Sequence, residues 1–318
     1  MKIALLEPLG IGEEMVRALA QPLIDAGHEF VYYDAKTTDV EELKRRSAGC
    51  EIVVIANNPY PGEVVCSADA LKMLDVAFTG IDHVGLEACR ERGVLVCNAA
   101  NYSNQTVAEL VIGLVIDLYR KILPGDAAVR AGGASAGLMG REICGKTVGI
   151  VGTGRIGTIT ANLFRAFGAK VVAYSRTRKP ELEAQGVEYM LLDELMRESD
   201  IISLHVPNNA STRRMIGREQ IALMKPTAIL VNCARGPVLD AAALADALNE
   251  GRIAGAGIDV FDCEPPIPES DPLRSARNTV LTPHVAFLSE ESMVRRAHIV
   301  FDNIWAYLKG APENVCKL

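Results

Sequence analysis

The sequence predicts an α/β protein with two doubly wound parallel sheets. Short apolar runs alternate with helical patterns over most of the 318 residues, and such alternation is typical of parallel sheets covered by helices. Near the middle of the chain a glycine-rich turn joins an apolar run to a helical pattern and starts a second series. A chain of this length also favours two domains. We predict a first domain of residues 1–99 completed by 288–318, and a second domain of residues 100–287.

The first domain contains five predicted strands separated by helices. The strands are 2–6, 30–33, 51–56, 76–79 and 94–98, and the helices are 13–25, 40–46, 63–74 and 86–92. Ligands of open α/β sheets bind beyond the carboxyl ends of the strands. The loops 57–61 and 78–83 lie at two such ends, so they are candidate ligand contacts, and ordinary turns are the alternative.

The sheet of the second domain begins with a strand at 147–151, which is followed by the motif Gly152-x-Gly154-x-x-Gly157 and a helical pattern at 158–167. Gly152 permits a tight turn, Gly154 lets the backbone approach a pyrophosphate, and Gly157 lets helix and strand pack closely. The N–H groups at the start of the helix favour phosphate groups. The motif therefore predicts a bound dinucleotide.

The end of the following strand, 170–174, indicates which dinucleotide. Enzymes that use NAD usually carry an acidic residue there, which binds the ribose 2′-hydroxyl. This chain instead continues with Ser175, Arg176 and Thr177, followed by two more cations. A 2′-phosphate suits such residues because a guanidinium forms charge-assisted hydrogen bonds to it. We expect NADP(H) to be preferred, with NAD(H) as the alternative cofactor; a solvated basic loop is the simpler explanation of the same residues.

The remaining elements complete a predicted six-stranded sheet. Further strands are 201–205, 228–232, 254–260 and 279–281, and further helices are 106–121, 218–223, 241–249 and 290–308. Residues 131–137 contain three glycines and are predicted to be a flexible arm. The last helix follows the final strand of the second sheet, so we expect it to return to the first domain.

Arg235, Glu264 and His284 each lie just past one of three consecutive strands of this sheet. Reduction of a 2-oxo acid requires a hydride at the carbonyl carbon and a proton at the carbonyl oxygen, and a histidine is the usual proton donor near neutral pH. We predict His284 as the acid/base, Glu264 as the residue that orients its ring, and Arg235 as the anchor of the substrate carboxylate. The simpler alternatives are a core histidine, a helix cap and a surface ion pair.

A second histidine, His205, also ends a strand and is a rival proton donor. No glutamate follows it closely, so we rank it below His284. We expect His205 and its neighbours Val206 and Pro207 to line the cofactor cleft instead.

Composition excludes several classes of protein. The net charge of −7 argues against nonspecific nucleic-acid binding. The eight cysteines form no C-x-x-C pair and no metal-ligand spacing, so we expect no metal and a reducing compartment. No window approaches 18 uncharged apolar residues, and an acid at position 7 interrupts the N-terminal apolar run. We therefore expect a cytoplasmic protein that does not bind membranes.

With these residues in view, the chain resembles the D-isomer-specific 2-hydroxy-acid dehydrogenase family over nearly its whole length. The resemblance rests on five motifs in the family's order: Gly152-x-Gly154-x-x-Gly157, Leu204-His205-Val206-Pro207, Asn232-Cys233-Ala234-Arg235-Gly236, Asp259-Val260-Phe261-x-x-Glu264-Pro265 and Thr282-Pro283-His284-x-Ala286. It implies a flavodoxin-like substrate domain, a Rossmann cofactor domain, and a homodimer formed through the arm of the cofactor domain.

The resemblance also implies individual contacts. It places Asp259 at the nicotinamide amide, Thr106 near the cofactor, and Asn58, Thr79 and Gly80 near the substrate, together with Arg235 and His284. The full set of expected cofactor contacts is Thr106, Gly152, Gly154, Arg155, Ile156, Gly157, Ser175, Arg176, Thr177, His205, Val206, Pro207, Cys233, Ala234 and Asp259.

Two departures from the family pattern bear on function. The missing acid after strand 170–174 makes the chain similar to the NADP-using glyoxylate and hydroxypyruvate reductases. Phe287 stands where many members have glycine, so the substrate pocket is expected to differ. The sequence thus predicts an enzyme that reduces a 2-oxo acid to a D-2-hydroxy acid and catalyses the reverse. The alternative is a dinucleotide-sensing binding protein, like the corepressors that resemble this family.

Overall fold

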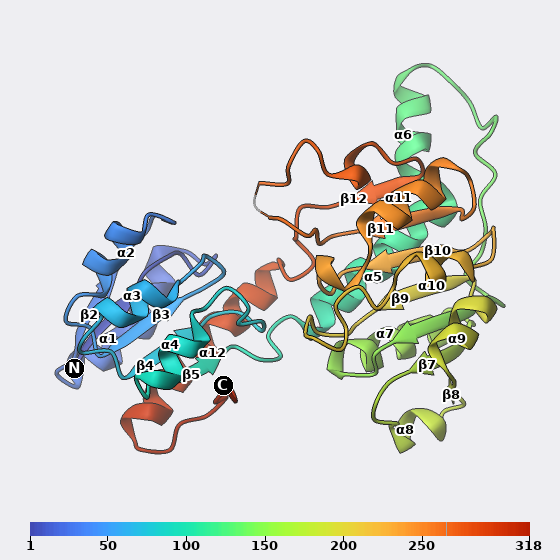
Figure 1. Ribbon diagram of the computed structural model, residues 1–318. Helices are drawn as coiled ribbons and strands as arrows, with labels where there is room; N and C mark the ends of the chain where they lie inside the picture. Colours follow the sequence, from blue (N-terminus) through green and yellow to red (C-terminus); the bar gives the residue numbers. More distant parts are fainter. Residues whose placement is uncertain (265) are drawn as a thin grey trace. The chain divides into compact units, whose positions relative to one another are not determined.

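The computed structural model describes residues 1–264 and 266–318 and contains two compact units (Figure 1). One unit comprises 1–103 with 288–318, and the other comprises 104–287. The division after residue 103 lies close to the predicted boundary after residue 99. Pro265, the last residue of one family motif, lies outside the described residues. The substrate-binding and cofactor-binding roles of the two units stay predictions.

The first unit is built on a five-stranded parallel sheet with the order β2-β1-β3-β4-β5. This is the flavodoxin-like order, with its reversal point between β1 and β3, as predicted. The strands are β1 (Lys2–Leu5), β2 (Glu29–Tyr32), β3 (Ile52–Ile55), β4 (Met73–Val76) and β5 (Leu95–Asn98). The helices are α1 (Glu13–Asp25), α2 (Val40–Ser47), α3 (Gly62–Ser67), α4 (Leu86–Glu91) and α12 (Glu290–Leu308).

One prediction in this unit was wrong. The helix expected at 63–74 ends at Ser67, and the strand expected at 76–79 is β4, three residues earlier. Asp69, Lys72 and Asp75 recur every three residues and imitate the polar face of a helix. Asp75 is in fact fully buried within a strand, so the polar residue that suggested a solvent face lies in the core.

The second unit is built on a seven-stranded parallel sheet with the order β12-β11-β10-β9-β6-β7-β8. Its strands are β6 (Thr147–Val151), β7 (Lys170–Tyr174), β8 (Glu188–Tyr189), β9 (Ile201–Leu204), β10 (Ile229–Asn232), β11 (Gly255–Ile258) and β12 (Thr279–Leu281). Its helices are α5 (Asn104–Arg120), α6 (Ile122–Arg130), α7 (Arg155–Ala166), α8 (Pro180–Glu183), α9 (Leu192–Glu198), α10 (Arg218–Ala222) and α11 (Ala241–Asn249), with short 3-10 turns at Gly236–Val238 and Pro272–Ser275.

Both faces of this second sheet are covered, because alternate residues of one strand join different apolar clusters. Ile201 of β9 packs with the cluster that contains Phe164 of α7, whereas Ile202 packs with the cluster that contains Leu195 of α9. Side chains alternate between the faces of a strand, so the two clusters lie on opposite faces. This is the doubly wound arrangement that the sequence predicts.

Four helices and strands of the second unit were not predicted, namely β8, α6, α8 and α9. The sheet has seven strands rather than six, because the two-residue β8 pairs with the edge of β7 and is too short to give an apolar pattern. Helix α6 contains Pro124, which suggests a break; this proline lies in the first helical turn, where its missing N–H is tolerated. Residues 131–137 form neither helix nor strand, as expected for an arm.

No helix in the described part of the chain combines the length and the apolarity needed to cross a membrane.

The C-terminal segment belongs to the first unit, where α12 is held by a buried polar contact. Asn303 of α12 donates from Nδ2 to Asp75 Oδ1 at 3.0 Å and to the carbonyl of Asn98 at 3.2 Å. Asn314 in turn donates to Asn303 Oδ1 at 2.8 Å. Burial raises the pKa of Asp75 to about 7, although the hydrogen bond from Asn303 opposes the shift.

We predict that this carboxyl makes stability depend on pH. A folded-state pKa of about 7, above the usual 3.8, gives a stabilising contribution that is complete below about pH 4 and is lost as the pH rises through about 7. Asp75→Asn removes the titration. The free energy of unfolding of wild type relative to Asp75→Asn should therefore fall by about 2 to 3 kcal/mol between pH 5 and pH 8 in urea titrations. An equal difference at both pH values would contradict the prediction.

Candidate active site

The glycine-rich turn has the close contacts that its predicted role requires. Gly152 has φ +101°, and a Cβ there would lie 2.8 Å from the carbonyl oxygen of His205. A Cβ on Gly157 would lie 2.0 Å from the carbonyl oxygen of Gly152. At Gly154, which precedes α7, a Cβ would meet no protein atom within 4 Å. Two glycines are therefore needed for packing and the third leaves open space at the helix N-terminus, which fits a dinucleotide pyrophosphate.

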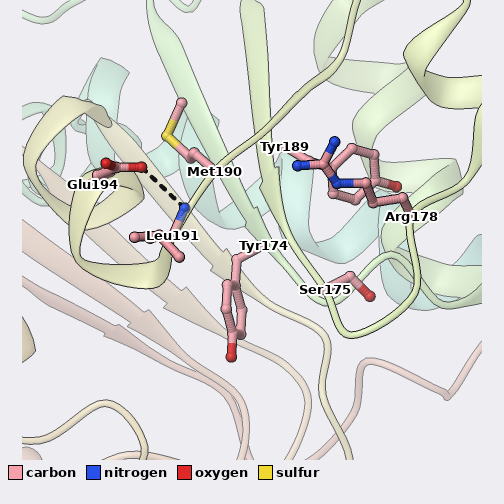
Figure 2. A pocket seen from close by; sticks show the side chains of 7 residues that line it. All are labelled: Tyr174, Ser175, Arg178, Tyr189, Met190, Leu191 and Glu194. Carbon is pink, nitrogen blue, oxygen red and sulfur yellow. Dashed lines mark hydrogen bonds between the residues drawn. The ribbon is translucent and has the colours of Figure 1, made fainter.

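A pocket of about 370 Å³ lies at the end of β7 (Figure 2). Its lining residues are Tyr174, Ser175, Arg178, Tyr189, Met190, Leu191 and Glu194. The guanidinium of Arg178 lies over the ring of Tyr189, 5.7 Å from its centroid. The hydroxyl of Tyr189 donates to Thr153 Oγ1 at 3.0 Å and accepts from the N–H of Lys179 at 3.1 Å. Tyr189 therefore ties the basic loop after β7 to the glycine-rich turn.

The structure places the three predicted phosphate-binding residues of that loop differently. Ser175 lines the pocket, whereas Arg176 and Thr177 are exposed and are absent from its lining. Arg178 pairs with Glu183 at 3.4 Å and Lys179 with Glu181 at 3.8 Å. Arg176 has no ion pair within residues 1–264 and 266–318. Unlike Arg178 and Lys179, it therefore has an uncommitted guanidinium, by which we mean one that pairs with no carboxylate of the chain.

His284 and Glu264 lie in contact, as predicted. The His284 Nδ1 atom is 3.1 Å from Glu264 Oε2, and the two side chains are 25% and 21% exposed. The ring of Phe287 meets that of His284 edge to face, with centroids 5.7 Å apart and an interplanar angle of 83°. The imidazole is thus oriented by a carboxylate at one nitrogen and packed by an aromatic ring.

Asp259 holds the loop that carries His284. Its carboxylate accepts from Thr282 Oγ1 at 2.6 Å, from the N–H of Val285 at 2.9 Å and from the N–H of Ala286 at 2.9 Å. Its backbone carbonyl accepts from the N–H of His284 at 2.7 Å. Asp259 is fully buried, and burial raises its pKa while these hydrogen bonds oppose the shift. Its predicted contact with a nicotinamide amide stays a prediction.

Arg235 follows β10, the strand next to β11. Asn232 shapes its loop by donating to the carbonyl of Arg235 at 3.0 Å and accepting from the N–H of Ala234 at 3.0 Å. Gly236 lets this loop approach the next one, because a Cβ there would lie 2.0 Å from the carbonyl oxygen of Phe261. Since β10, β11 and β12 are parallel neighbours, the segments with Arg235, Glu264 and His284 share one edge of the sheet.

His205 has an environment that opposes a role as proton donor. Its Nε2 lies 2.8 Å from Ser203 Oγ, and burial lowers its pKa to about 3. It is therefore neutral at neutral pH. Its backbone and Val206 lie against Gly152, so this segment adjoins the glycine-rich turn, where we expect cofactor contacts.

The other predicted site residues take several environments. Cys233 is buried, which raises the pKa of its thiol well above the usual value. Arg155 is exposed at the start of α7, while Ile156 and Thr106 are half-buried on α7 and α5. No group of three or more His, Cys, Asp or Glu side chains suited to a metal ion occurs among the described residues.

The predicted substrate contacts of the first unit lie beyond the carboxyl ends of β3 and β4. Asn58 donates from Nδ2 to the carbonyl of Thr37 at 3.2 Å, and the carbonyl of Thr79 accepts from Asn98 Nδ2 at 2.7 Å. Gly80 follows in the same loop. Sequence reasoning missed Tyr189, because β8 gave no pattern, and the loop contacts of Asp259, for which the motif gave a cofactor role.

Comparisons with known proteins found a matching family and similar proteins over most of the chain. The family described as D-isomer specific 2-hydroxyacid dehydrogenase, NAD binding domain, matches residues 112–286. A glyoxylate reductase of Korarchaeum cryptofilum is 38% identical over 288 residues, 88% of this chain and 86% of that protein. A hydroxypyruvate reductase of Blautia hydrogenotrophica is 34% identical over 302 residues, 92% and 93% of the two chains. A solved acyclic imino acid reductase in complex with NADPH and D-Arg has a TM-score of 0.89 and 31% identity, with full coverage of both chains.

Proposed function

Because the chain belongs to the D-isomer-specific 2-hydroxyacid dehydrogenase family, we propose that it reduces a small 2-oxo acid to the D-2-hydroxy acid with NADPH and catalyses the reverse reaction. The observation that carries this proposal is the contact between His284 and Glu264. This pair lies at the carboxyl edge of the same sheet that bears the glycine-rich turn. A nicotinamide cofactor and a proton donor are the two requirements of the reaction.

We propose the following roles for the three side chains. Glu264 accepts from the Nδ1–H of His284, which fixes the tautomer and leaves Nε2 to exchange the proton with the substrate oxygen. Arg235 binds the substrate carboxylate through its planar guanidinium. A bound nicotinamide dinucleotide supplies the hydride. In the reverse direction, Nε2 of His284 accepts the proton from the hydroxyl group.

Glyoxylate and hydroxypyruvate are the first substrates to test, because two relatives that are 38% and 34% identical to this chain are named as reductases of these two acids. Oxidation of NADPH with glyoxylate, hydroxypyruvate, pyruvate and phenylpyruvate tests the proposal. Turnover of any of them supports an enzyme. Cofactor binding without turnover of any 2-oxo acid would favour the alternative, a dinucleotide-sensing binding protein.

We predict that His284→Ala lowers kcat by roughly 10²–10⁴-fold, because general acid catalysis contributes about that much. Steady-state kinetics with the best 2-oxo acid measure the loss. His298→Ala is the matched control, since His298 is exposed on α12, and it should keep wild-type kinetics. A decrease of less than tenfold in His284→Ala would mean that another group supplies the proton.

The preference for NADPH is proposed from the loop after β7, which lacks an acid and carries the uncommitted guanidinium of Arg176. Arg176→Ala should raise the KM for NADPH by roughly 10- to 100-fold, because a charge-assisted hydrogen bond contributes about 1.5–3 kcal/mol, while the KM for NADH stays constant. Arg197→Ala, an exposed charge on α9, is the control. Equal kcat/KM for both cofactors, unchanged in Arg176→Ala, would refute the preference.

We also propose a homodimer formed through α6 and the arm that follows it. Four large apolar side chains are exposed in α6 or just after the arm, namely Ile122, Leu123, Val129 and Met139, with exposed fractions of 51%, 56%, 74% and 90%. Figure 1 shows α6 standing clear of the sheet of its own unit. Exposed apolar clusters of this kind favour a protein contact. Sedimentation velocity should give a dimer for wild type and a monomer for Val129→Glu; a monomeric wild type would rule the proposal out.

Location and other partners stay predictions. All eight cysteines are free, and we propose the reducing cytoplasm, where thiols persist, as the location. A small-molecule acid remains the expected partner, and binding to nucleic acid or membranes is not expected.

A further inference from the structure

Glu7 lies at the reversal point of the first sheet and has no role in the family motifs. It follows β1, and the strand order reverses between β1 and β3, where ligands of doubly wound sheets bind. Its Oε1 accepts from the N–H of Ala56 at 2.7 Å and from the N–H of Asn58 at 3.2 Å. Glu7 thus reaches across the reversal point and holds the loop after β3.

One oxygen of this buried carboxylate has no hydrogen-bond partner among the described residues. Glu7 is 2% exposed, and its Oε2 is buried with no hydrogen-bond partner within the described residues. A buried polar atom without a partner costs free energy. The buried guanidinium of Arg296, on α12, interacts electrostatically with Glu7, but no ion pair within 4 Å joins them among the described residues. An apolar residue would avoid the cost of the buried Oε2 but would leave the N–H groups of Ala56 and Asn58 without this acceptor. The acid is therefore matched to the backbone of the loop after β3.

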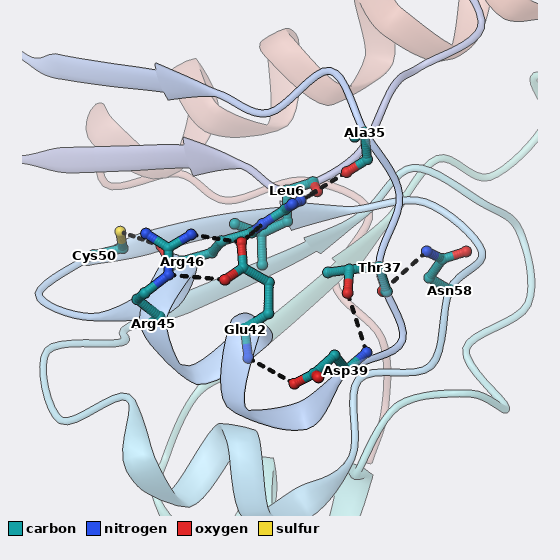
Figure 3. A network of polar contacts seen from close by, with 9 residues as sticks. All are labelled: Leu6, Ala35, Thr37, Asp39, Glu42, Arg45, Arg46, Cys50 and Asn58. Carbon is teal, nitrogen blue, oxygen red and sulfur yellow. Dashed lines mark hydrogen bonds and ion pairs between the residues drawn. The ribbon is translucent and has the colours of Figure 1, made fainter.

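The loop that Glu7 holds is fixed from two further directions. The side chain of Asn58 donates to the carbonyl of Thr37, and Figure 3 shows this contact beside the cap of α2. On the other side, His83 Nε2 lies 2.9 Å from the carbonyl of Ala56. His83 belongs to the loop after β4, so both predicted substrate loops of this unit meet at Ala56.

The strand end before Glu7 is fixed as well. Arg46 of α2 donates from Nη1 to the carbonyl of Leu6 at 2.9 Å and to the carbonyl of Ala35 at 2.7 Å (Figure 3). Arg46 is buried and also pairs with Glu42 at 2.7 Å. The backbone that carries Glu7 is therefore anchored independently, and the carboxylate extends from a fixed position to the loop.

We propose that Glu7 is a positioning residue for the substrate: its carboxylate fixes the backbone of residues 56–58, and so Asn58, in the shape that binds the 2-oxo acid. This inference rests on the proposed function, because it requires Asn58 to contact substrate. It assigns Glu7 no contact with the cofactor or with the reacting atoms. Loss of Glu7 should therefore weaken binding of the 2-oxo acid and leave binding of NADPH intact.

Kinetics of Glu7→Leu, Glu7→Gln and the surface control Glu14→Leu test the proposal with the best 2-oxo acid of the panel. Glu7→Leu removes both acceptor bonds, so the KM for the acid should rise at least about tenfold, since small displacements of positioning groups have effects of this size. The KM for NADPH should stay within about twofold of wild type. Glu7→Gln keeps an acceptor oxygen and should restore near-wild-type KM, and Glu14→Leu should change neither constant.

Glu7→Asp provides a second test if the leucine variant does not fold, because it keeps the charge but is one methylene shorter. It too should raise the KM for the 2-oxo acid. An unchanged KM for the acid in Glu7→Leu or Glu7→Asp, or parallel changes in the KM values for acid and NADPH, overturns the role of Glu7 while the proposed function stands. A wild-type protein that turns over no 2-oxo acid overturns both.

Discussion

The hydrogen bonds of the buried Asp259 carboxylate fix the loop that carries His284, the proposed proton donor. They hold Thr282, Val285 and Ala286 on either side of the histidine. His284 itself has φ +53°, a left-handed conformation that is uncommon for a residue with a side chain. Such a conformation persists only where the surroundings determine it. Without these hydrogen bonds, the loop would not be held in the conformation that places the imidazole beside Glu264.

In the first unit, too, a buried carboxylate at a strand end holds the loop after the neighbouring strand. Glu7 lies two residues beyond β1 and accepts from backbone N–H groups of the loop after the neighbouring β3. Asp259 lies one residue beyond β11 and accepts from the loop after the neighbouring β12. In a parallel sheet the loops at the carboxyl edge have N–H groups that no strand satisfies. A carboxylate from the adjacent strand end satisfies several of these groups at once and makes each loop rigid.

Sequence patterns predicted the elements with long apolar runs and the residues whose chemistry is local. The glycine-rich turn, its flanking strand and helix, and the contact of Glu264 with His284 belong to this class. Sequence patterns did not predict the features that depend on contacts between distant parts of the chain. The two residues of β8 become a strand because β7 offers an open edge, and Asp75 is buried because Asn303, more than 200 residues away, binds it. The hydrogen bonds of Asp259 were equally invisible, because its partners are mostly backbone atoms.

The two histidines at strand ends illustrate how environment separates similar residues. His205 and His284 both follow a strand of the second sheet, and the sequence left both as candidate proton donors. His205 has a serine hydroxyl as its neighbour, and burial lowers its pKa to about 3. Its ring is therefore neutral at neutral pH and is not the protonated imidazolium that a proton donor requires. His284 is a quarter exposed and has a carboxylate at Nδ1. A proton donor must also be oriented toward the substrate oxygen, and a carboxylate at the far ring nitrogen provides that orientation. His284 has such a carboxylate in Glu264, whereas His205 has a serine hydroxyl, and this difference argues for His284 more strongly than the motif in which it lies.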